Sequence, residues 1–275
     1  MLFVYRKPRP PLDAYVESVW SCRGSYPSSA LQRVLPTGGA QLTINLVEDE
    51  IRLYDRAERG IQCTAMPGTI LTGITTRSQI IDTAEQEYVT GVVFRPGGTL
   101  PFFEAPASEI TNADVPLEFM WGRTIVERLR EQLLAAHSPD SALDVLEDGL
   151  LSAWRDRTTH PAVAFALRRF RATPSLARLQ TITNAIGLSP KRFTERFKTE
   201  VGVTPKQYCR LLRFQCAVKL AYKREVNWAR LSMDCGYFDQ AHFIHEFREF
   251  SGLTPGGYRT AYTEFQNHVN FLQYP

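Results

Sequence analysis

The chain has 275 residues, of which 44% are hydrophobic and 22% are charged, and its formal net charge is +3. This length and composition argue against a disordered or fibrous protein and are sufficient for two domains, each with its own core. The five cysteines are scattered, with no Cys-x-x-Cys pair and no histidine at zinc-finger spacing, so we expect reduced thiols, no metal site and no cofactor. The N-terminus lacks a signal-peptide core and no apolar run reaches about 18 residues, which predicts a cytoplasmic protein without a membrane partner.

The charge is unevenly distributed along the chain. Residues 160–262 contain 17 Lys and Arg against 7 Asp and Glu, a balance of +10, whereas residues 1–159 contain 15 against 21, a balance of −6. A basic segment beside an acidic one is expected when one domain meets phosphates and the other has a different task. The alternative explanation for the uneven distribution is a chance imbalance of charges on the solvated surface.

The first part of the chain, to about residue 106, is predicted to be β-rich. Proline and glycine recur at short intervals, and between them lie β-branched runs such as 40–47 and 88–94, which fit half-buried strands. We expect a small, mostly antiparallel barrel or sandwich with an early helix at about residues 11–22.

Apolar residues then recur with helical spacing. Helices are predicted at about 116–137 and 139–155, the second beginning at Ser138-Pro139, an N-cap followed by proline at the first helical position. Their apolar stripes either pack on the strands or form a homodimer surface. The stripe of the first helix consists of Leu117, Trp121, Ile125, Leu129 and Leu133. Together with the strands, these helices define a sensor or dimerisation domain over residues 1–157.

The second half of the chain contains an internal repeat at an offset of 50 residues. In each copy a helix, at about 176–186 or 228–235, ends near a glycine, and a second helix follows a tight turn. This is the helix-turn-helix arrangement, so residues 158–262 are predicted to be an all-α DNA-binding domain and 263–275 a tail. The fold class is therefore α+β. The repeated residues are Phe193, Phe197, Gly202, Thr204, Pro205 and Tyr208, then Phe243, Phe247, Gly252, Thr254, Pro255 and Tyr258.

The second helix of each copy presents polar side chains opposite its two phenylalanines. Ser189 and Asp239 stand at the predicted N-caps, and side chains near a helix start reach deepest into a groove. Lys, Arg and Gln donate to base edges, and Glu accepts from cytosine N4. The outward residues are Lys191, Arg192, Glu195, Lys198 and Thr199 in the first copy, and Gln240, Ala241, His242, His245, Arg248 and Glu249 in the second.

One helix of roughly 18 residues, from Pro205 to Tyr222, is predicted between the copies, spanning about 27 Å. A rigid helix of that length is suited to hold two recognition helices about one DNA turn, ~34 Å, apart. The predicted partner is double-stranded DNA, read in two adjacent major grooves. Basic residues along or just after this helix are expected in part to lie near phosphates: Arg210, Arg213, Lys219, Lys223, Arg224 and Arg230.

Residues 160–259 resemble the AraC/XylS family of bacterial transcription regulators, through Gly236–Arg248 with its Phe-x-x-x-Phe motif and Gly252-Leu-Thr-Pro-Gly-Gly-Tyr-Arg259. This chain departs from the family at Glu195 and His245, where arginine is frequent. Glu195 either reads a cytosine amine or pairs with Lys191 at i+4 spacing. The resemblance implies base contacts by Lys191, Thr194 and Glu195 in the first copy and by Gln240, Ala241 and His245 in the second.

The N-terminal region resembles the β-rich sensor domain attached to one branch of that family, through Val34–Gly39 and Gly91–Gly98. The Pro-Gly-Gly turn reverses the chain and leaves Phe94 and Arg95 at a strand end, where pockets in such barrels open. Trp20, Phe94 and Arg95 are the candidate ligand-binding residues. A salt-bridged or surface position is the alternative for Arg95.

Three functions are compatible with these patterns. In the leading hypothesis, a small-molecule effector or a partner occupies the N-terminal domain and changes how the helix-turn-helix units engage a promoter, where RNA polymerase is a further partner. In the second, the N-terminal domain is a ligand-independent oligomerisation or polymerase-contact module. The third is an alkyl-DNA repair enzyme with a metal-held cysteine, for which Cys22 and Cys63 alone are too few ligands. We therefore expect that the protein is not an enzyme and has no catalytic residues.

Overall fold

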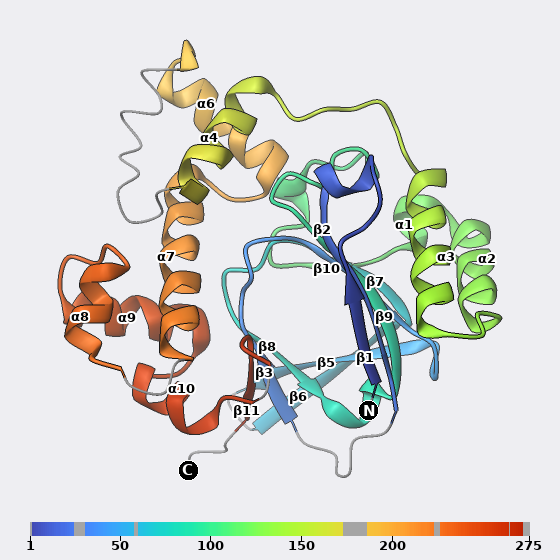
Figure 1. Ribbon diagram of the computed structural model, residues 1–275, viewed down its shortest axis with the longest axis horizontal. Coiled ribbons are helices and arrows are strands. Elements are labelled where there is room, and N and C mark those ends of the chain that lie inside the picture. Colours follow the sequence, from blue (N-terminus) through green and yellow to red (C-terminus); the bar gives the residue numbers. More distant parts are fainter. Residues whose placement is uncertain are drawn as a thin grey trace.

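The computed structural model has a β-rich N-terminal half and a helical C-terminal half (Figure 1). It describes residues 2–24, 31–57, 60–172, 186–222, 226–263 and 265–271. The α+β architecture expected from the sequence is confirmed. Within the described ranges, every helix is too short or too polar to cross a membrane.

Two antiparallel sheets form the β-rich half. Sheet A has the strand order β1 (Leu2–Arg6), β2 (Val16–Arg23), β9 (Tyr88–Phe94), β4 (Gln41–Asn45), β7 (Thr69–Thr72) and β10 (Asp114–Pro116). Sheet B has the order β11 (His268–Asn270), β3 (Leu31–Val34), β8 (Gln79–Asp82), β5 (Glu50–Ala57) and β6 (Gly60–Pro67). Short 3-10 turns lie at Leu12–Ala14, Thr83–Gln86 and Ala107–Glu109.

The helix expected at about residues 11–22 is wrong. Only the turn at Leu12–Ala14 is helical, and strand β2 follows it. The register of β2 against β9 shifts between Val16 and Ser18, so that the buried Val16 and Val19 are three residues apart. This bulge breaks the period of two and imitates the spacing of a helix face.

Three helices cover the outer face of sheet A, on the side opposite the helical C-terminal half (Figure 1). They are α1 (Glu118–Trp121), α2 (Arg123–Leu134) and α3 (Pro139–Ser152). The single helix expected at about 116–137 is interrupted at Gly122, whose φ of 88° lies in the left-handed region. Leu129 and Leu133 pack into the core, whereas Ile125 is 54% exposed, so most of the apolar stripe packs on the sheet.

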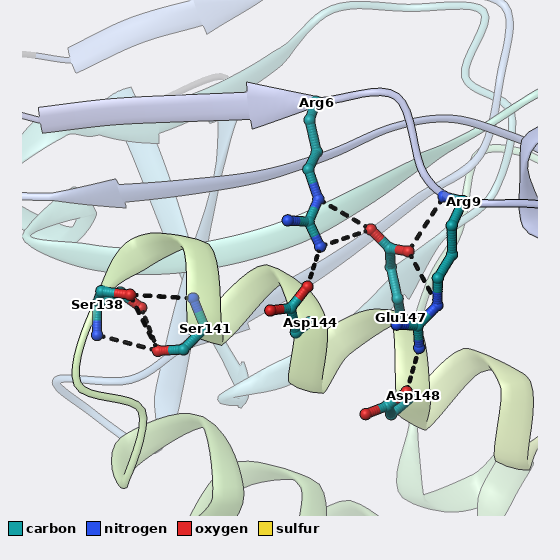
Figure 2. Close-up of polar contacts among 7 residues, drawn as sticks. All are labelled: Arg6, Arg9, Ser138, Ser141, Asp144, Glu147 and Asp148. Carbon is teal, nitrogen blue, oxygen red and sulfur yellow. Dashed lines mark hydrogen bonds and ion pairs between the residues drawn. The ribbon is translucent and has the colours of Figure 1, made fainter.

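A buried carboxylate fixes α3 to the end of β1 (Figure 2). The side chain of Glu147 is 1% exposed and accepts hydrogen bonds from Arg6 Nε at 3.0 Å and from the backbone N–H of Arg9 at 3.1 Å. At the start of α3, Ser138 Oγ accepts from the backbone N–H of Ser141 at 3.1 Å. The N-cap predicted at Ser138 is therefore present.

The helical half surrounds a core of aromatic residues. Its helices are α4 (Pro161–Ala172), α6 (Pro190–Val201), α7 (Pro205–Ala221), α8 (Trp228–Asp234), α9 (Gln240–Ser251) and α10 (Pro255–Ala261). The single helix predicted between the two repeats is confirmed as α7. Most of the first helix predicted for the first copy, at about 176–186, lies outside the described residues.

The two halves are in direct contact. Leu35 and Ile74 of the β-rich half belong to the same hydrophobic cluster as the helical core. Thr111 Oγ1 donates a hydrogen bond to the backbone oxygen of Gly202, at the end of α6, at 2.6 Å. Residues 263–275 were expected to form a separate tail, but strand β11 within them pairs with β3 and extends sheet B.

Candidate nucleic-acid interface

Each repeat places a glycine turn and an N-cap before its second helix. In the second copy, Gly236 has a φ of 79°, and Asp239 Oδ1 accepts from the backbone N–H of His242 at 2.7 Å. In the first copy, Gly187 has a φ of 70°, and Ser189 Oγ accepts from the backbone N–H of Arg192 at 3.4 Å. Local sequence therefore sets the starting points of α6 and α9.

Paired phenylalanines fix which face of each helix points outward. The ring centroids of Phe193 and Phe197 lie 5.7 Å apart in α6, and those of Phe243 and Phe247 lie 5.6 Å apart in α9. All four side chains are fully buried. The opposite face of each helix is consequently turned toward solvent.

The structure places the predicted DNA-contacting residues on those outward faces. Thr194 is half-buried. His242 is exposed, but its ring packs edge-on against Tyr237 at 5.4 Å and its Nε2 lies 3.7 Å from Glu246 Oε2. The other predicted residues are exposed, namely Ser189, Lys191, Arg192, Glu195, Lys198, Gln240, Ala241 and His245. Their contacts with bases remain predictions.

A buried ion-pair cluster joins the second recognition helix to α7. The side chain of Glu246 on α9 is 2% exposed and accepts from Arg210 Nε at 2.7 Å and from Arg213 Nη2 at 3.2 Å. The guanidinium of Arg213 also lies over the ring of Tyr237 at 5.4 Å. Only some of the basic residues along α7 were expected near phosphates, and the observed partner of both Arg210 and Arg213 is this carboxylate. Glu246 was missed in the sequence, where its place beside Phe243 and Phe247 on the inward face was the available signal.

A second buried carboxylate lies at the end of α6. Glu200 is 5% exposed and accepts from the backbone N–H of His160, just before α4, at 2.9 Å. Burial raises the pKa of Glu200, while this hydrogen bond and Arg196 act in the opposite direction. The end of the first recognition helix is thus tied to the helix that opens the helical half.

A cavity of about 430 Å³ lies between the two sheets, and we call it the lumen cavity. Trp20, one of the three candidate ligand-binding residues, lines it, and its contact with a ligand remains a prediction. Its other lining residues include Gln32, Gln41, Val93, Phe265 and His268. Among the described residues, no group of three or more His, Cys, Asp or Glu is arranged to hold a metal ion.

The predictions for Phe94 and Arg95 are wrong as regards this cavity. Because side chains alternate along β9, Val93 faces the lumen, whereas Phe94 is 1% exposed and packs against Phe102 on the other face of the sheet, with ring centroids 5.6 Å apart. Arg95 donates from Nε to the backbone oxygen of Asp13 at 3.1 Å, and its Nη1 lies 3.3 Å from Glu17. The salt-bridged alternative for Arg95 is the observed one.

Each half of the chain matches a known family model. Residues 182–261 match the family described as a helix-turn-helix domain, and residues 5–116 match a domain of unknown function (DUF6597). The HTH-type transcriptional activator RhaR of Salmonella schwarzengrund is 24% identical over 142 residues, which cover 52% of this chain and 45% of RhaR. The helical half therefore carries an AraC-type helix-turn-helix domain of the kind found in HTH-type transcriptional regulators.

Two further comparisons concern other proteins. The probable transcriptional regulator LumQ of Photobacterium leiognathi is 31% identical over 72 residues, 26% of this chain and 29% of LumQ. The matched segments thus span less than half the length of these curated relatives. The structure of ToxT from Vibrio cholerae is 10% identical, with a TM-score of 0.47, and the similarity covers 94% of this chain and 98% of ToxT.

Glu195 is the residue of the first recognition helix at which this chain was expected to depart from the AraC/XylS pattern. The structure describes both Glu195 and Lys191 and shows no ion pair between them; both side chains are exposed. The pairing weighed as one alternative for Glu195 is therefore not formed, and its carboxylate faces the surface where DNA is expected.

Proposed function

We propose that this chain is a sequence-specific DNA-binding transcription regulator that reads two adjacent major grooves and acts on RNA polymerase at a promoter. The observation that carries the proposal is the pair of recognition helices, α6 and α9, each anchored by buried phenylalanines and presenting an exposed polar face. Helix α7 between them has 17 residues, which correspond to about 26 Å. That length is compatible with two grooves one DNA turn, about 34 Å, apart.

The test is fluorescence anisotropy with DNA from upstream of the gene that encodes the chain, compared with random-sequence DNA. We expect a preference for the upstream DNA and a steep loss of affinity with rising salt. Lys191→Ala and Gln240→Ala are each expected to weaken binding about tenfold or more, because each removes a donor to a base edge. Lys7→Ala, a charge-changing variant in the other half, serves as the control. Equal affinity for both DNAs contradicts the proposal.

We further propose that a small-molecule effector controls this regulator through its N-terminal half. The lumen cavity supports this, because its volume of about 430 Å³ lies in the range of small-molecule sites. A metabolite screen by thermal shift tests it, since a ligand selective for the native fold must raise the melting temperature. If no compound raises it, the N-terminal half is better described as a ligand-independent oligomerisation or polymerase-contact module.

We propose a homodimer formed through the helices after the β-rich part. Phe119, Ile125 and Leu134 on α1 and α2 are 76%, 54% and 54% exposed, which leaves an apolar surface for a second copy. Light scattering is expected to show a dimer that Ile125→Glu converts to a monomer. The control is Phe238→Glu, at a 91% exposed position in the helical half. A monomeric unaltered chain contradicts the dimer.

A further inference from the structure

The C-terminal strand β11 separates the lumen cavity from the core of the helical half. It runs antiparallel to β3, with His268 opposite Val34. Because side chains alternate along a strand, His268 lines the lumen cavity while Val269, which is 0% exposed, belongs to the hydrophobic cluster of the helical half. One strand is therefore shared by the cavity and the core that supports the recognition helices.

Hydrogen bonds tie the segment around β11 to both halves. The backbone N–H of Leu35 donates to the oxygen of Asn267 at 2.8 Å, on the side of β3. On the other side, the hydroxyl of Tyr258 in α10 donates to the backbone oxygen of Gln266 at 2.9 Å. Gln215 of α7 donates from Nε2 to Asn267 Oδ1 at 3.2 Å. A displacement of this segment would therefore alter its hydrogen bonds to both α7 and α10.

Aromatic rings and uncharged polar groups line the lumen cavity. Phe265 lies two residues before Asn267 in the same segment. Its ring centroid is 5.5 Å from that of Phe3, and the ring centroids of Phe3 and Trp20 are 6.1 Å apart. Gln32 and Gln41 add amide groups. Among the described residues that line this cavity there is no Asp, Glu, Lys or Arg.

His268 adds no charge to this lining. Burial lowers the pKa of His268 to about 4, so its imidazole is neutral at physiological pH. Nδ1 lies 3.3 Å from Gln32 Oε1, an oxygen that can only accept. The tautomer with the proton on Nδ1 satisfies this contact and leaves Nε2 as an acceptor.

A smaller cavity of about 130 Å³ adjoins the first and shares Trp20 and His268 with it. Two charged residues, Arg52 and Asp114, line it, and both are already engaged. Arg52 Nε lies 2.8 Å from Glu50 Oε1, and Asp114 Oδ2 accepts from Gln79 Nε2 at 3.1 Å. The polar atoms of both residues are thus already engaged within the protein.

We propose that the lumen cavity binds an uncharged ligand with an aromatic ring and amide or hydroxyl groups, and that Phe265 and His268 of the C-terminal segment form part of its wall. The described lining residues offer no counter-ion to a charged ligand, so the hydration that such a ligand loses on contact with the aromatic wall is not compensated. This inference rests on the proposed effector control, because it defines the ligand class and the segment that joins the ligand to the helical half.

The ligand class is tested with three probes of equal shape on the full chain: 2-naphthamide, which is neutral, 2-naphthoate, which is anionic, and 2-naphthamidine, which is cationic. Thermal-shift titrations give their relative affinities. We expect the neutral amide to bind at least about tenfold more tightly than either charged probe. No shift with the amide, or an equal affinity for a charged probe, overturns the proposal.

The role of the C-terminal segment is tested by two aromatic substitutions within it. Phe265→Ala removes a ring from the cavity wall, whereas Phe271→Ala removes a ring that stacks under Arg33 outside the cavity lining. We expect Phe265→Ala to weaken binding of 2-naphthamide about tenfold and Phe271→Ala to change it less than about twofold. If the two substitutions change the affinity for 2-naphthamide equally, the proposal that Phe265 forms part of the cavity wall is overturned.

DNA binding of the same samples separates this inference from the proposed function. If the chain binds DNA sequence-specifically but does not bind 2-naphthamide, only the ligand inference is contradicted. Preferential binding of the neutral probe by a chain that does not distinguish upstream from random DNA supports the ligand inference and contradicts the DNA-binding function.

Discussion

Arg210 on α7 donates a hydrogen bond from Nε to Oε2 of Glu246 on α9 at a distance of 2.7 Å. The acceptor carboxylate is 2% exposed, and the arginine side chain is 26% exposed. This contact joins the helix between the repeats to the second recognition helix. The orientation of α9 relative to α7 therefore depends on a carboxylate on the inward face of α9.

Glu246→Gln is expected to lower the free energy of unfolding by about 2–4 kcal/mol, because Arg210 and Arg213 are left partly buried without a carboxylate. Glu249→Gln removes a 47% exposed partner of the same Arg210 and is expected to cost less than about 1 kcal/mol. Urea unfolding of both variants measures the difference. Equal losses of unfolding free energy in the two variants would show that the burial of Glu246 does not increase the stability lost on its substitution.

Gly91→Ala is expected to destabilise the β-rich half by about 1–3 kcal/mol. A Cβ at this position would lie 2.4 Å from the backbone oxygen of Leu42 and 2.6 Å from Cζ2 of Trp20, so the indole must leave its place against the sheet. Gly256→Ala is the control, since its Cβ would meet nothing within 4 Å and a helical alanine is favourable. Thermal unfolding with tryptophan fluorescence reports both variants. A Gly91→Ala chain as stable as the Gly256→Ala chain contradicts this prediction.

The lowered pKa of His268 is expected to reduce the free energy of unfolding of the chain at acidic pH. Its pKa is lowered from 6.5 to about 4 in the folded chain, so between these values the unfolded chain binds a proton that the folded chain excludes. The stabilisation is fully present above about pH 6.5 and is lost as the pH falls toward 4, by about 3 kcal/mol in all.

The measurement for His268 compares urea unfolding of the unaltered chain and of His268→Asn across this pH range. Glu200, whose pKa is raised, acts in the opposite direction and is common to both proteins, so the difference between them isolates His268. Parallel pH profiles would be inconsistent with a His268 that stays neutral in the folded chain as the pH falls toward 4.

Glu195→Gln is expected to tighten binding to random-sequence DNA by about two- to fivefold at about 0.1 M salt, because an unpaired carboxylate is removed from the surface facing the phosphates. If Glu195 reads a cytosine, the same change also reduces the preference for the upstream site. Anisotropy titrations on both DNAs measure the two effects. Unchanged affinity for both would place Glu195 outside the interface.

The recognition helices were predictable because their signals are local. The spacing of Phe193 and Phe197, repeated by Phe243 and Phe247, defines a buried helix face, and a capping residue precedes each helix. Glycine turns complete the pattern. Burial, capping and turn conformation therefore agree over about 20 residues, and the structure follows the sequence closely there.

Other features depend on contacts that local patterns do not reveal. Whether Phe94 or Val93 faces the lumen depends on strand register, and a shift of one residue exchanges the two faces. The pairing of Arg210 with Glu246 joins residues 36 positions apart. The pairing of His268 with Val34 joins strands more than 200 residues apart, and a three-residue strand carries too little sequence signal to be predicted.

The addition of β11 to sheet B has a consequence for work with isolated fragments. In the full chain, the backbone N–H and C=O groups on one edge of β3 are satisfied by β11. A fragment that ends before residue 263 would leave that edge open, and open edges recruit strands from other copies. Aggregation of such a fragment would then indicate a missing edge strand rather than an intrinsically unstable β-rich half.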